Sequence, residues 1–384
     1  MKYVQGLILQ ESSEDDFNFI EGYLGFDDGK IVEVEEGKIP SEINESDVIG
    51  KGVVLPTLAN PHTHIGDSVA KGIEFPEPVT IESLLAPPDG LKHRILRESS
   101  ETDLINAMKA TLEDMVRAGI SEFCDFREMG TDGVKQLKSA VEGVPINPVI
   151  FGRPSGLDYE VQEFNDLLTE VDGVGISAIS DYDEDVLVKI TEHTKKAGKG
   201  LALHVSERVR EDLDKVLELT PDFLIHMTKG TSDDFGNLKE ANVPVIICPR
   251  SNLFFGNTPD IEQMLDNDLT MALGTDNVML NQPDIFQEMK AAYGILDSQW
   301  DRSSTETASE IFKMGIINGR KILNHKYNIP HHQLQVGAEA KFILIEIPYK
   351  DLEPTKVIVN EVGIEDISII SIGQFLSHGK RPVD

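Results

Sequence analysis

Four histidines and one aspartate in this chain have the types and spacing of a divalent metal site. His62 and His64 end an apolar run as a His-x-His pair, and alternate residues of a β-strand point to the same side of a sheet. His204, His226 and Asp276 each end a short apolar segment of their own, which is where a parallel β/α barrel carries catalytic groups. A single histidine is more often a hydrogen-bonded core residue, but the repeated placement at strand ends favours a metal site.

This donor set of imidazoles and a carboxylate also predicts the cofactor. It suits one divalent metal, with zinc as the first choice and iron(II) or manganese as alternatives. A cation in such a site lowers the pKa of bound water towards about 7, so that hydroxide forms at neutral pH. The chemistry predicted from these residues is therefore hydrolysis.

Glu207 lies three residues after His204, just past the end of the predicted strand. From there its carboxyl group can take a proton from the metal-bound water and pass it to a leaving group, as general base and then general acid. The alternative is an acidic residue in the first turn of a helix over residues 207–219, stabilised by the helix dipole. Because the metal residues are close in the predicted fold, we interpret Glu207 as the proton shuttle.

Apolar runs that alternate with helical periodicity predict how these residues are positioned. Near-continuous apolar runs suit strands buried on both faces, and strands that alternate with helices predict a parallel sheet. The eight predicted strands are 52–60, 120–125, 147–152, 173–179, 200–204, 222–226, 243–248 and 269–275. Predicted helices between them include 101–118 with Thr102 as its cap, 184–197 and 207–219. Eight such units predict an α/β fold that closes into a (β/α)8 TIM-like barrel.

The two ends of the chain have a different pattern, with short alternating segments between turn signals, as at residues 26–34. We therefore expect residues 1–50 and 331–384 to form one small β-sandwich module together. The metal-dependent catalytic barrel is predicted over residues 51–330. Residues 74–90 are rich in proline and directly follow the first predicted strand, so they are expected to cover the barrel mouth as a lid.

The composition is that of a globular protein with a strongly acidic surface. Of the 384 residues, 40% are hydrophobic and 27% are charged, and 67 acidic against 35 basic residues give a formal net charge of −32. This charge argues against nucleic acid and anionic membranes as partners. It reflects either a salt-adapted host or simply a well-solvated surface.

The sequence also predicts a location and the kind of partner. No run of about 18 apolar residues is present and the start has no signal-peptide pattern, so neither a membrane span nor secretion is expected. Cys124 and Cys248 lie in apolar contexts far apart, which indicates buried thiols in a reducing cytoplasm. We expect a cytoplasmic protein that binds a small-molecule substrate, and a homo-oligomer is compatible with the sequence.

These residues and their order resemble the amidohydrolase superfamily of metal-dependent barrel hydrolases. Residues 204–207 read His-x-x-Glu, as in its deaminase and triazine-hydrolase (chlorohydrolase) branch. Residues 248–253 resemble the Cys-Pro-x-Ser-Asn-Leu of cytosine, guanine and S-adenosylhomocysteine-type deaminases, and residues 274–277 resemble the Gly-Thr-Asp that ends their eighth strand. A helix over 305–323 and residues 336–341 resemble the segments after the eighth strand in that branch. The resemblance covers most of the chain in order.

The resemblance implies a role for each of the first residues. Four of them would ligate one metal: His62, His64, His204 and Asp276. His226 would hydrogen-bond the water or the substrate, Glu207 would shuttle protons, and Asp276 would also take a proton from the attacking water. Relatives with two metals use a carboxylated lysine on the fourth strand, and residues 173–180 contain no lysine, so a single metal is implied.

Three arginines follow predicted barrel strands and are candidates for binding an anionic substrate group: Arg127, Arg153 and Arg250. A guanidinium group pairs well with a carboxylate, a phosphate or the carbonyl edge of a ring. The alternative is that the arginines pair with local acids such as Asp125 and Glu128. Asn252, in the segment that resembles the deaminases, is assigned to substrate binding with them.

The residues therefore predict a metal-dependent hydrolase that acts on a carbon–nitrogen bond other than a peptide bond. The first interpretation is an aminohydrolase (deaminase) that attacks a purine-, pyrimidine-, pterin- or triazine-like heterocycle through metal-activated hydroxide. Alternatives with the same site are hydrolysis of an amide or cyclic amide, and displacement of chloride. A remote alternative is a barrel that serves as a non-catalytic binding module. Release of ammonia distinguishes deamination from all of these.

Overall fold

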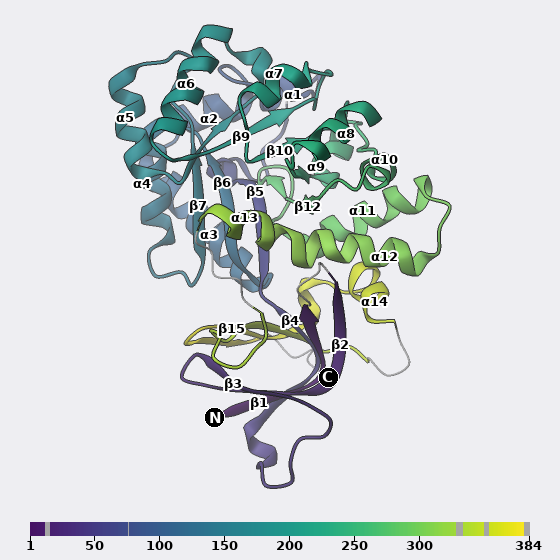
Figure 1. Cartoon of the computed structure of the whole chain (residues 1–384). Coiled ribbons are helices and arrows are strands. Elements are labelled where there is room, and N and C mark those ends of the chain that lie inside the picture. Colours follow the sequence, from purple (N-terminus) through teal and green to yellow (C-terminus); the bar gives the residue numbers. More distant parts are fainter. Residues whose placement is uncertain (12–15, 76, 328–332, 349–352, 380–384) are drawn as a thin grey trace.

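The computed structural model describes residues 1–11, 16–75, 77–327, 333–348 and 353–379. Figure 1 shows two parts, a β/α barrel and a smaller sheet built from both ends of the chain. The barrel confirms the predicted α/β fold. Within the described residues, no helix has both the length and the hydropathy needed to cross a membrane.

Parallel strands form the wall of the barrel and set the positions of the site residues. They are β5 (Leu58–His64), β6 (Ile120–Arg127), β7 (Asn147–Gly152), β8 (Gly173–Ile176), β9 (Gly200–Val205), β10 (Phe223–His226), β11 (Val245–Ile247), β12 (Met271–Leu273) and β13 (Asp276–Asn277). Their order is β12-β11-β10-β9-β8-β7-β6-β5-β13, so the end of the last barrel strand returns to the first. The apolar runs are buried on both sides, as expected for a parallel sheet covered by helices.

The eighth predicted strand, 269–275, contains β12, and after a break the chain continues as β13, which brings Asp276 to the first strand. Thr275 N donates to His62 O at 3.1 Å, and Asp276 then pairs with Thr63. A Cβ atom at Gly274 would lie 2.8 Å from His62 Cβ, so a residue without a side chain is needed for this close approach. The break therefore places the carboxylate beside the His-x-His pair.

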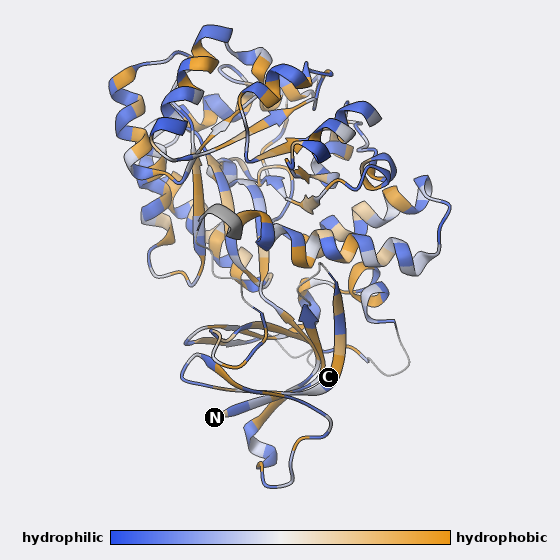
Figure 2. Cartoon of the chain, viewed as in Figure 1, coloured by the Kyte–Doolittle hydropathy of each residue, from blue (hydrophilic) through white to orange (hydrophobic). Residues whose placement is uncertain are grey.

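Helices follow most barrel strands and cover the outside of the sheet (Figure 1). The helices of the described residues are α1 (Ile81–Leu84), α2 (Leu91–Glu98), α3 (Glu101–Arg117), α4 (Gly130–Val141), α5 (Val161–Glu170), α6 (Glu184–Lys196), α7 (Leu213–Glu218), α8 (Ser232–Glu240), α9 (Pro249–Phe254), α10 (Ile261–Asp266), α11 (Ile285–Gln299), α12 (Ser304–Phe312), α13 (Gly319–Tyr327) and α14 (Pro354–Asn360). A π-helical segment (Lys313–Asn318) joins α12 to α13. Figure 2 shows hydrophobic residues gathered in the barrel strands, with hydrophilic residues on the outer helices.

Two details of the predicted helices differ from the structure, and the first is the cap of α3. The predicted cap, Thr102, is wrong. α3 begins at Glu101, and the Ser100 hydroxyl accepts the Asp103 N–H at 3.1 Å. Serine at this position satisfies a backbone donor that the first turn leaves unpaired.

The second difference concerns the predicted helix 207–219, which is helical only as α7. The Glu211 carboxylate accepts the backbone N–H of Ser180 at 3.2 Å and of Ser206 at 2.9 Å. In return, Ser206 Oγ accepts the Glu211 N–H at 3.0 Å. These side-chain bonds compete with helix formation and close a loop instead. Glu207 therefore lies in a loop at the strand end and not in the first turn of a helix.

The smaller sheet has seven strands from the two ends of the chain. They are β1 (Lys2–Glu11), β2 (Phe17–Asp27), β3 (Lys30–Glu36), β4 (Val48–Pro56), β14 (Lys341–Ile345), β15 (Ile367–Ile372) and β16 (Phe375–His378). Their order is β16-β15-β14-β4-β1-β2-β3. Both ends of the chain thus form one module as expected, but its strands make one continuous mixed sheet where a β-sandwich was predicted. Phe26 and Phe342, with ring centroids 5.1 Å apart, belong to its hydrophobic core.

The first predicted strand, 52–60, spans two strands in two different sheets. β4 ends at Pro56 between β1 and β14 of the smaller sheet, and β5 begins at Leu58 in the barrel. Both strands are buried, so the apolar run carries no pattern that marks the change of sheet. The division of the chain at residues 50 and 330 stays a prediction, and β4 crosses the first of these positions.

Candidate metal centre

The four residues predicted to hold a metal meet at the carboxyl ends of the barrel strands. His62 and His64 stand on β5, His204 on β9 and Asp276 on β13, and one donor atom from each lies within 4.8 Å of the others. His64 Nε2 lies 3.2 Å from His204 Nε2 and 3.6 Å from Asp276 Oδ1. His62 Nε2 lies 3.3 Å from the same oxygen. The predicted set is thus brought together in space.

Hydrogen bonds behind two of these histidines fix which ring nitrogen can bind a cation. His204 Nδ1 lies 2.9 Å from Ile176 O. His64 Nδ1 lies 3.2 Å from Phe126 O and 3.1 Å from Glu128 Oε1. These oxygens accept, so each Nδ1 carries the hydrogen and each Nε2 presents a lone pair. Two lone pairs that face each other at 3.2 Å repel unless a cation lies between them.

The spacing of the donor atoms fits a tetrahedral zinc ion. Nitrogen ligands about 2.0–2.1 Å from zinc, at tetrahedral angles, lie about 3.3 Å apart. His62 gives a second indication, because neither of its buried ring nitrogens has a hydrogen-bond partner among the described residues. Buried polar atoms are normally paired, so an unpaired imidazole beside a carboxylate suits a ligand atom. The residues present therefore fit one divalent cation.

Burial keeps the imidazoles in the neutral form that binds metals. It lowers the pKa of His62 and His204, and it lowers the pKa of His64 to about 3 with a contribution from Lys92. Burial alone would raise the pKa of Asp276, but the His62 ring beside it and the neighbouring histidines hold it well below its usual value. Metal ligands must be deprotonated, and these side chains are.

The metal-free protein is expected to lose stability as the pH falls below about 6.5, the ordinary histidine pKa. The unfolded chain takes up protons there, whereas in the folded chain His64 takes one up only near a pKa of about 3. Since the unfolded state binds more protons, the free energy of unfolding decreases by about 1.4 kcal/mol per pH unit for each such histidine. Urea unfolding after metal removal measures the slope. His64→Asn should reduce it, and an unchanged slope would contradict the neutral assignment.

A second group lies beside the first and shares one member: Glu207, His226 and Asp276. His226 is the last residue of β10, and its Nε2 lies 3.5 Å from Glu207 Oε1. Burial raises the pKa of Glu207, and the nearby His226 opposes this shift. A carboxyl group with a raised pKa in such a place is suited to accept a proton and return it.

The backbone at these strand ends adopts an uncommon conformation. The φ angle is 75° at His226, 57° at Asp276 and 51° at Ser206, and few non-glycine residues adopt such left-handed values. Each costs on the order of 1 kcal/mol. Strained residues of this kind cluster at functional sites, and two of these three, His226 and Asp276, belong to the predicted site.

Ser251 and Asn252 lie behind this group, on α9. Ser251 Oγ donates to Asp276 Oδ2, and Asn252 Nδ2 lies 3.1 Å from His226 Nδ1. Neither residue lines the pocket that opens from the metal residues. Their contacts orient Asp276 and His226, so the position of Asn252 does not support its predicted contact with substrate.

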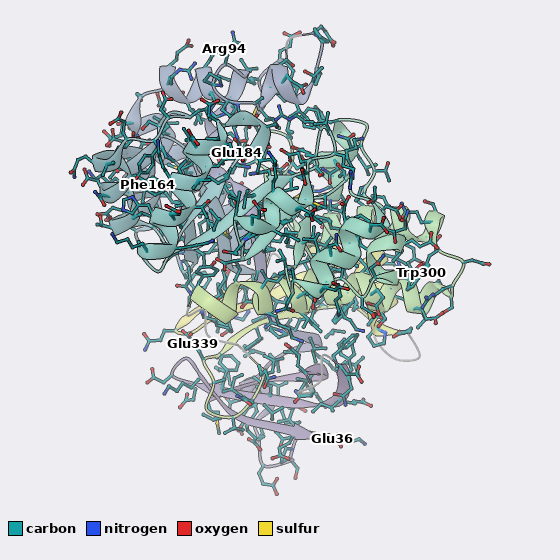
Figure 3. The ribbon with its side chains drawn as sticks, turned by 45° about the horizontal axis from the view of Figure 1, so that its top comes forward. Glu36, Arg94, Phe164, Glu184, Trp300 and Glu339 are labelled. Atoms are coloured by element: carbon teal, nitrogen blue, oxygen red, sulfur yellow. The ribbon has the colours of Figure 1, made fainter. Side chains whose placement is uncertain are left out.

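A pocket leads from the metal residues to the surface and holds about 600 Å³, its open mouth included. That size suits a small molecule. Its base is lined by His64, His204, Glu207, His226 and Asp276. Ile81, Leu85 and Pro87 line one wall, which places this part of the proline-rich segment where the lid was expected; residue 76 lies outside the described residues. In Figure 3, Arg94 on α2 marks this end of the molecule and Glu36 on β3 the opposite end.

The three arginines predicted to bind substrate have different surroundings. Arg153 lines the pocket. Arg127 is 1% exposed and donates to Glu128 Oε2 at 3.0 Å. Arg250 donates to Glu288 Oε1 at 2.7 Å. For Arg127 and Arg250, which are absent from the pocket lining, the structure favours the alternative of pairing with nearby acids.

Sequence reasoning missed Lys92 and considered Glu128 only as an acid that pairs with arginines, whereas the two residues together join the metal residues to α2. Glu128 Oε1 lies 3.1 Å from His64 Nδ1, 2.8 Å from Lys92 Nζ and 3.2 Å from Arg153 Nη2. Burial alone would raise the pKa of Glu128, but Lys92, His64 and Arg127 hold it well below its usual value. A carboxylate behind a ligating imidazole orients the ring. The available signal was the place of Glu128 three residues after the predicted strand 120–125.

Glu128→Gln is expected to lower the free energy of unfolding by about 3–5 kcal/mol. The change would leave three buried cations without their shared carboxylate: Lys92, Arg127 and Arg153. Urea denaturation followed by circular dichroism measures the effect. Glu170→Gln, in an exposed pair with Lys138, is the control and should leave stability unchanged. Equal stability of the Glu128 variant and the wild type would refute this account of the cluster.

Comparison with known sequences places these residues in a wider context. Residues 53–365 match the model described as the amidohydrolase family. A putative aminohydrolase of Methanothermobacter thermautotrophicus is 34% identical over 286 residues, which cover 70% of this chain and 73% of the relative. The 5'-deoxyadenosine deaminase of Methanobrevibacter smithii is 25% identical over 403 residues, covering 95% and 90%.

Solved structures share the arrangement of the whole chain. An adenosine deaminase from Xanthomonas campestris with bound zinc has a TM-score of 0.77 at 14% identity, covering 100% of this chain and 94% of that one. The zinc complex of the atrazine chlorohydrolase of Arthrobacter aurescens has a TM-score of 0.75 at 14% identity, covering 99% and 95%. At such identities the likeness establishes the fold alone.

Proposed function

Because the chain belongs to the amidohydrolase family, we propose that it is a metal-dependent aminohydrolase that releases ammonia from an amino-substituted heterocycle. The ring would be of the purine, pyrimidine, pterin or triazine type. The observation that carries the proposal is the pair Glu207 and His226, which stands beside a complete metal donor set at the base of a pocket. Relatives named as deaminases over most of the chain support it.

His62, His64, His204 and Asp276 would hold one divalent ion, with zinc as the first choice and iron(II) or manganese as alternatives. When bound, the ion supplies a Lewis acid and a water acidic enough to ionise near neutral pH. β8 carries no lysine that could bridge a second ion, which supports a single metal.

The residues around the ion would carry out the proton transfers. Glu207 would take a proton from the attacking water and deliver it to the amino nitrogen that leaves. His226 would donate a hydrogen bond from Nε2 to the oxygen that becomes the ring carbonyl, since Asn252 occupies its Nδ1. Asp276 would take up the second proton while Ser251 holds its other oxygen, and that proton would end on the ring nitrogen of the oxo product. One water is consumed, and the products are the oxo-heterocycle and ammonia.

Ammonia release from a panel of aminopurines, aminopyrimidines, pterins, aminotriazines and their nucleosides tests the proposal. Protein with a measured zinc content is expected to release ammonia from one family of rings in amounts equal to the oxo product. If the panel yields no ammonia but amides are cleaved or chloride is released, the proposal is wrong and one of those activities replaces it. A zinc-loaded protein that is inert towards all of these would favour a binding module.

The remaining expectations about partners and location stay predictions. A small-molecule substrate follows from the pocket and the family, whereas the cytoplasmic location, the homo-oligomer and the exclusion of nucleic acid and membranes rest on the sequence arguments. Gel filtration with light scattering measures the oligomeric state directly.

A further inference from the structure

We propose that the substrate carries an anionic group, a carboxylate or a phosphate, which binds to Lys92 and Arg153 in the wall of the pocket. The inference rests on the proposed aminohydrolase function and adds the class of substrate. Lys92 belongs to α2, which directly follows the lid segment 74–90, and Arg153 directly follows β7. Both residues line the pocket.

These two cations have few hydrogen-bond acceptors around them. Lys92 is 3% exposed and Arg153 is 6% exposed, and buried cations normally have a full set of hydrogen bonds. Here the two share one oxygen, since Lys92 Nζ lies 2.8 Å and Arg153 Nη2 3.2 Å from Glu128 Oε1. Arg153 Nε has no hydrogen-bond partner in the described part of the chain. The pair therefore has donors left for a further acceptor.

The pocket is the side from which such an acceptor can come. Glu128 is absent from the pocket lining, so it supports the cations from behind. Of the other acids in the pocket, Asp181 accepts from Arg208 at 2.8 Å, and Glu211 accepts two backbone N–H groups. The remaining acids, Glu207 and Asp276, lie at the base of the pocket, where they are assigned to proton transfer and to the metal. An anion that enters the pocket thus meets an ammonium and a guanidinium group, the combination that binds carboxylate and phosphate oxygens.

The short path from the cations to the metal residues fixes where the anion sits relative to the reacting carbon. The same Glu128 oxygen lies 3.1 Å from His64 Nδ1, so the two cations are separated from a metal residue by a single carboxylate. The anionic group would therefore be attached to the ring or to a short substituent. Because Lys92 comes from α2 and Arg153 from the barrel, the bound anion would also hold α2 against the barrel.

Matched substrates tested on the zinc-loaded wild type give the first experiment. The pairs are pterin and pterin-6-carboxylate, cytosine and 5-carboxycytosine, and adenosine and adenosine 5'-monophosphate. At least one anionic member should exceed its neutral partner in kcat/KM by about 10-fold or more, as for a charge-assisted hydrogen bond. A preference for the carboxylate members or for the phosphate member shows which of the two anionic groups the substrate carries. A neutral member that is preferred in every active pair would overturn the proposal, and this result needs no variant.

Variants then assign the effect to the two residues. Lys92→Met and Arg153→Met should each raise KM for the anionic substrate about 10- to 100-fold, at least about 10-fold more than they raise it for its neutral partner. Lys92→Arg should restore part of the selectivity. Arg302→Met is the control, because Arg302 is exposed and stacks on Trp300. Equal losses on neutral and anionic partners would mean that the residues serve the fold, and the proposal would fail.

A binding measurement separates failure of this inference from failure of the proposed function. Inorganic phosphate and benzoate are titrated calorimetrically into the zinc-loaded wild type and the Lys92→Met/Arg153→Met double variant. The wild type should bind one of these anions at least about 10-fold more tightly, even if no ring releases ammonia. An anion held by the zinc ion alone would bind both proteins alike, and that result would overturn the inference.

Discussion

Glu207→Gln is expected to lower kcat for ammonia release by about 10³-fold or more, because general acid–base catalysis contributes roughly 10²–10⁴-fold and this residue handles the proton of two steps. The glutamine amide has nearly the shape of the carboxyl group but cannot accept a proton near neutral pH. Glu207 lies outside the four-ligand set, so the zinc content should stay at the wild-type level. Steady-state kinetics with metal analysis on the same sample gives both quantities.

Glu184→Gln is the matched control for this prediction. Glu184 is an exposed acid at the start of α6, paired with Lys215 on the outside of the barrel. Its variant should keep the wild-type rate and zinc content. If the Glu207 variant retained more than about a tenth of the rate, the proton-shuttle role would be wrong. If it lost zinc together with activity, Glu207 would instead belong to the metal ligands.

His204→Asn is expected to abolish zinc binding at micromolar metal and to lower the rate of ammonia release by at least about 10³-fold, since a bound metal supplies several kcal/mol of transition-state stabilisation. His204 Nε2 lies 3.2 Å from His64 Nε2, and its Nδ1 is held by Ile176 O at 2.9 Å. Asparagine keeps a polar group near that carbonyl but cannot place a donor atom at the Nε2 position. Metal analysis and the ammonia assay measure the two effects.

Thermal unfolding adds a second readout, because zinc that binds the folded state stabilises it. Added zinc should raise the midpoint of wild-type unfolding and leave the His204 variant unchanged. His378→Asn, on the exposed strand β16, is the control and should behave as the wild type. One zinc per chain together with a wild-type rate in the His204 variant would contradict the assigned site.

The metal donor set could be predicted from the sequence because its signals are local. A His-x-His pair in a strand places both rings on one side, and each further donor directly follows its own apolar run. A barrel then brings strand ends together whatever the details of the connections. This is why His62, His64, His204 and Asp276 could be predicted to meet, and the structure places them within 4.8 Å.

The surroundings of that set could not be predicted, because they depend on contacts between distant segments. Lys92 and Glu128 are 36 residues apart in the sequence, and their contact at 2.8 Å depends on how α2 packs over the mouth of the barrel. The prediction of a helix that begins at Glu207 was wrong because the Glu211 carboxylate accepts the backbone N–H groups of Ser180 and Ser206. Such a contact leaves no periodic pattern in the sequence.

The arginines show why a residue type at a strand end is a weak signal by itself. Arg127, Arg153 and Arg250 all follow or end barrel strands, yet Arg127 and Arg250 turn to buried acids. Which way each side chain turns depends on acids from other elements, such as Glu288 on α11. The uniform apolar run across β4 and β5 hides a change of sheet for a similar reason, since burial on both sides looks the same in either sheet.

The central claim is that this chain releases ammonia through one metal ion held by the four predicted residues. A zinc titration of the chelated protein, with ammonia release measured across the heterocycle panel at each metal content, tests it most directly. The expected result is a rate that rises in proportion to bound zinc and stops rising at one zinc per chain. A rate independent of bound metal, a rise that continues to two ions per chain, or no ammonia at full occupancy would contradict the claim.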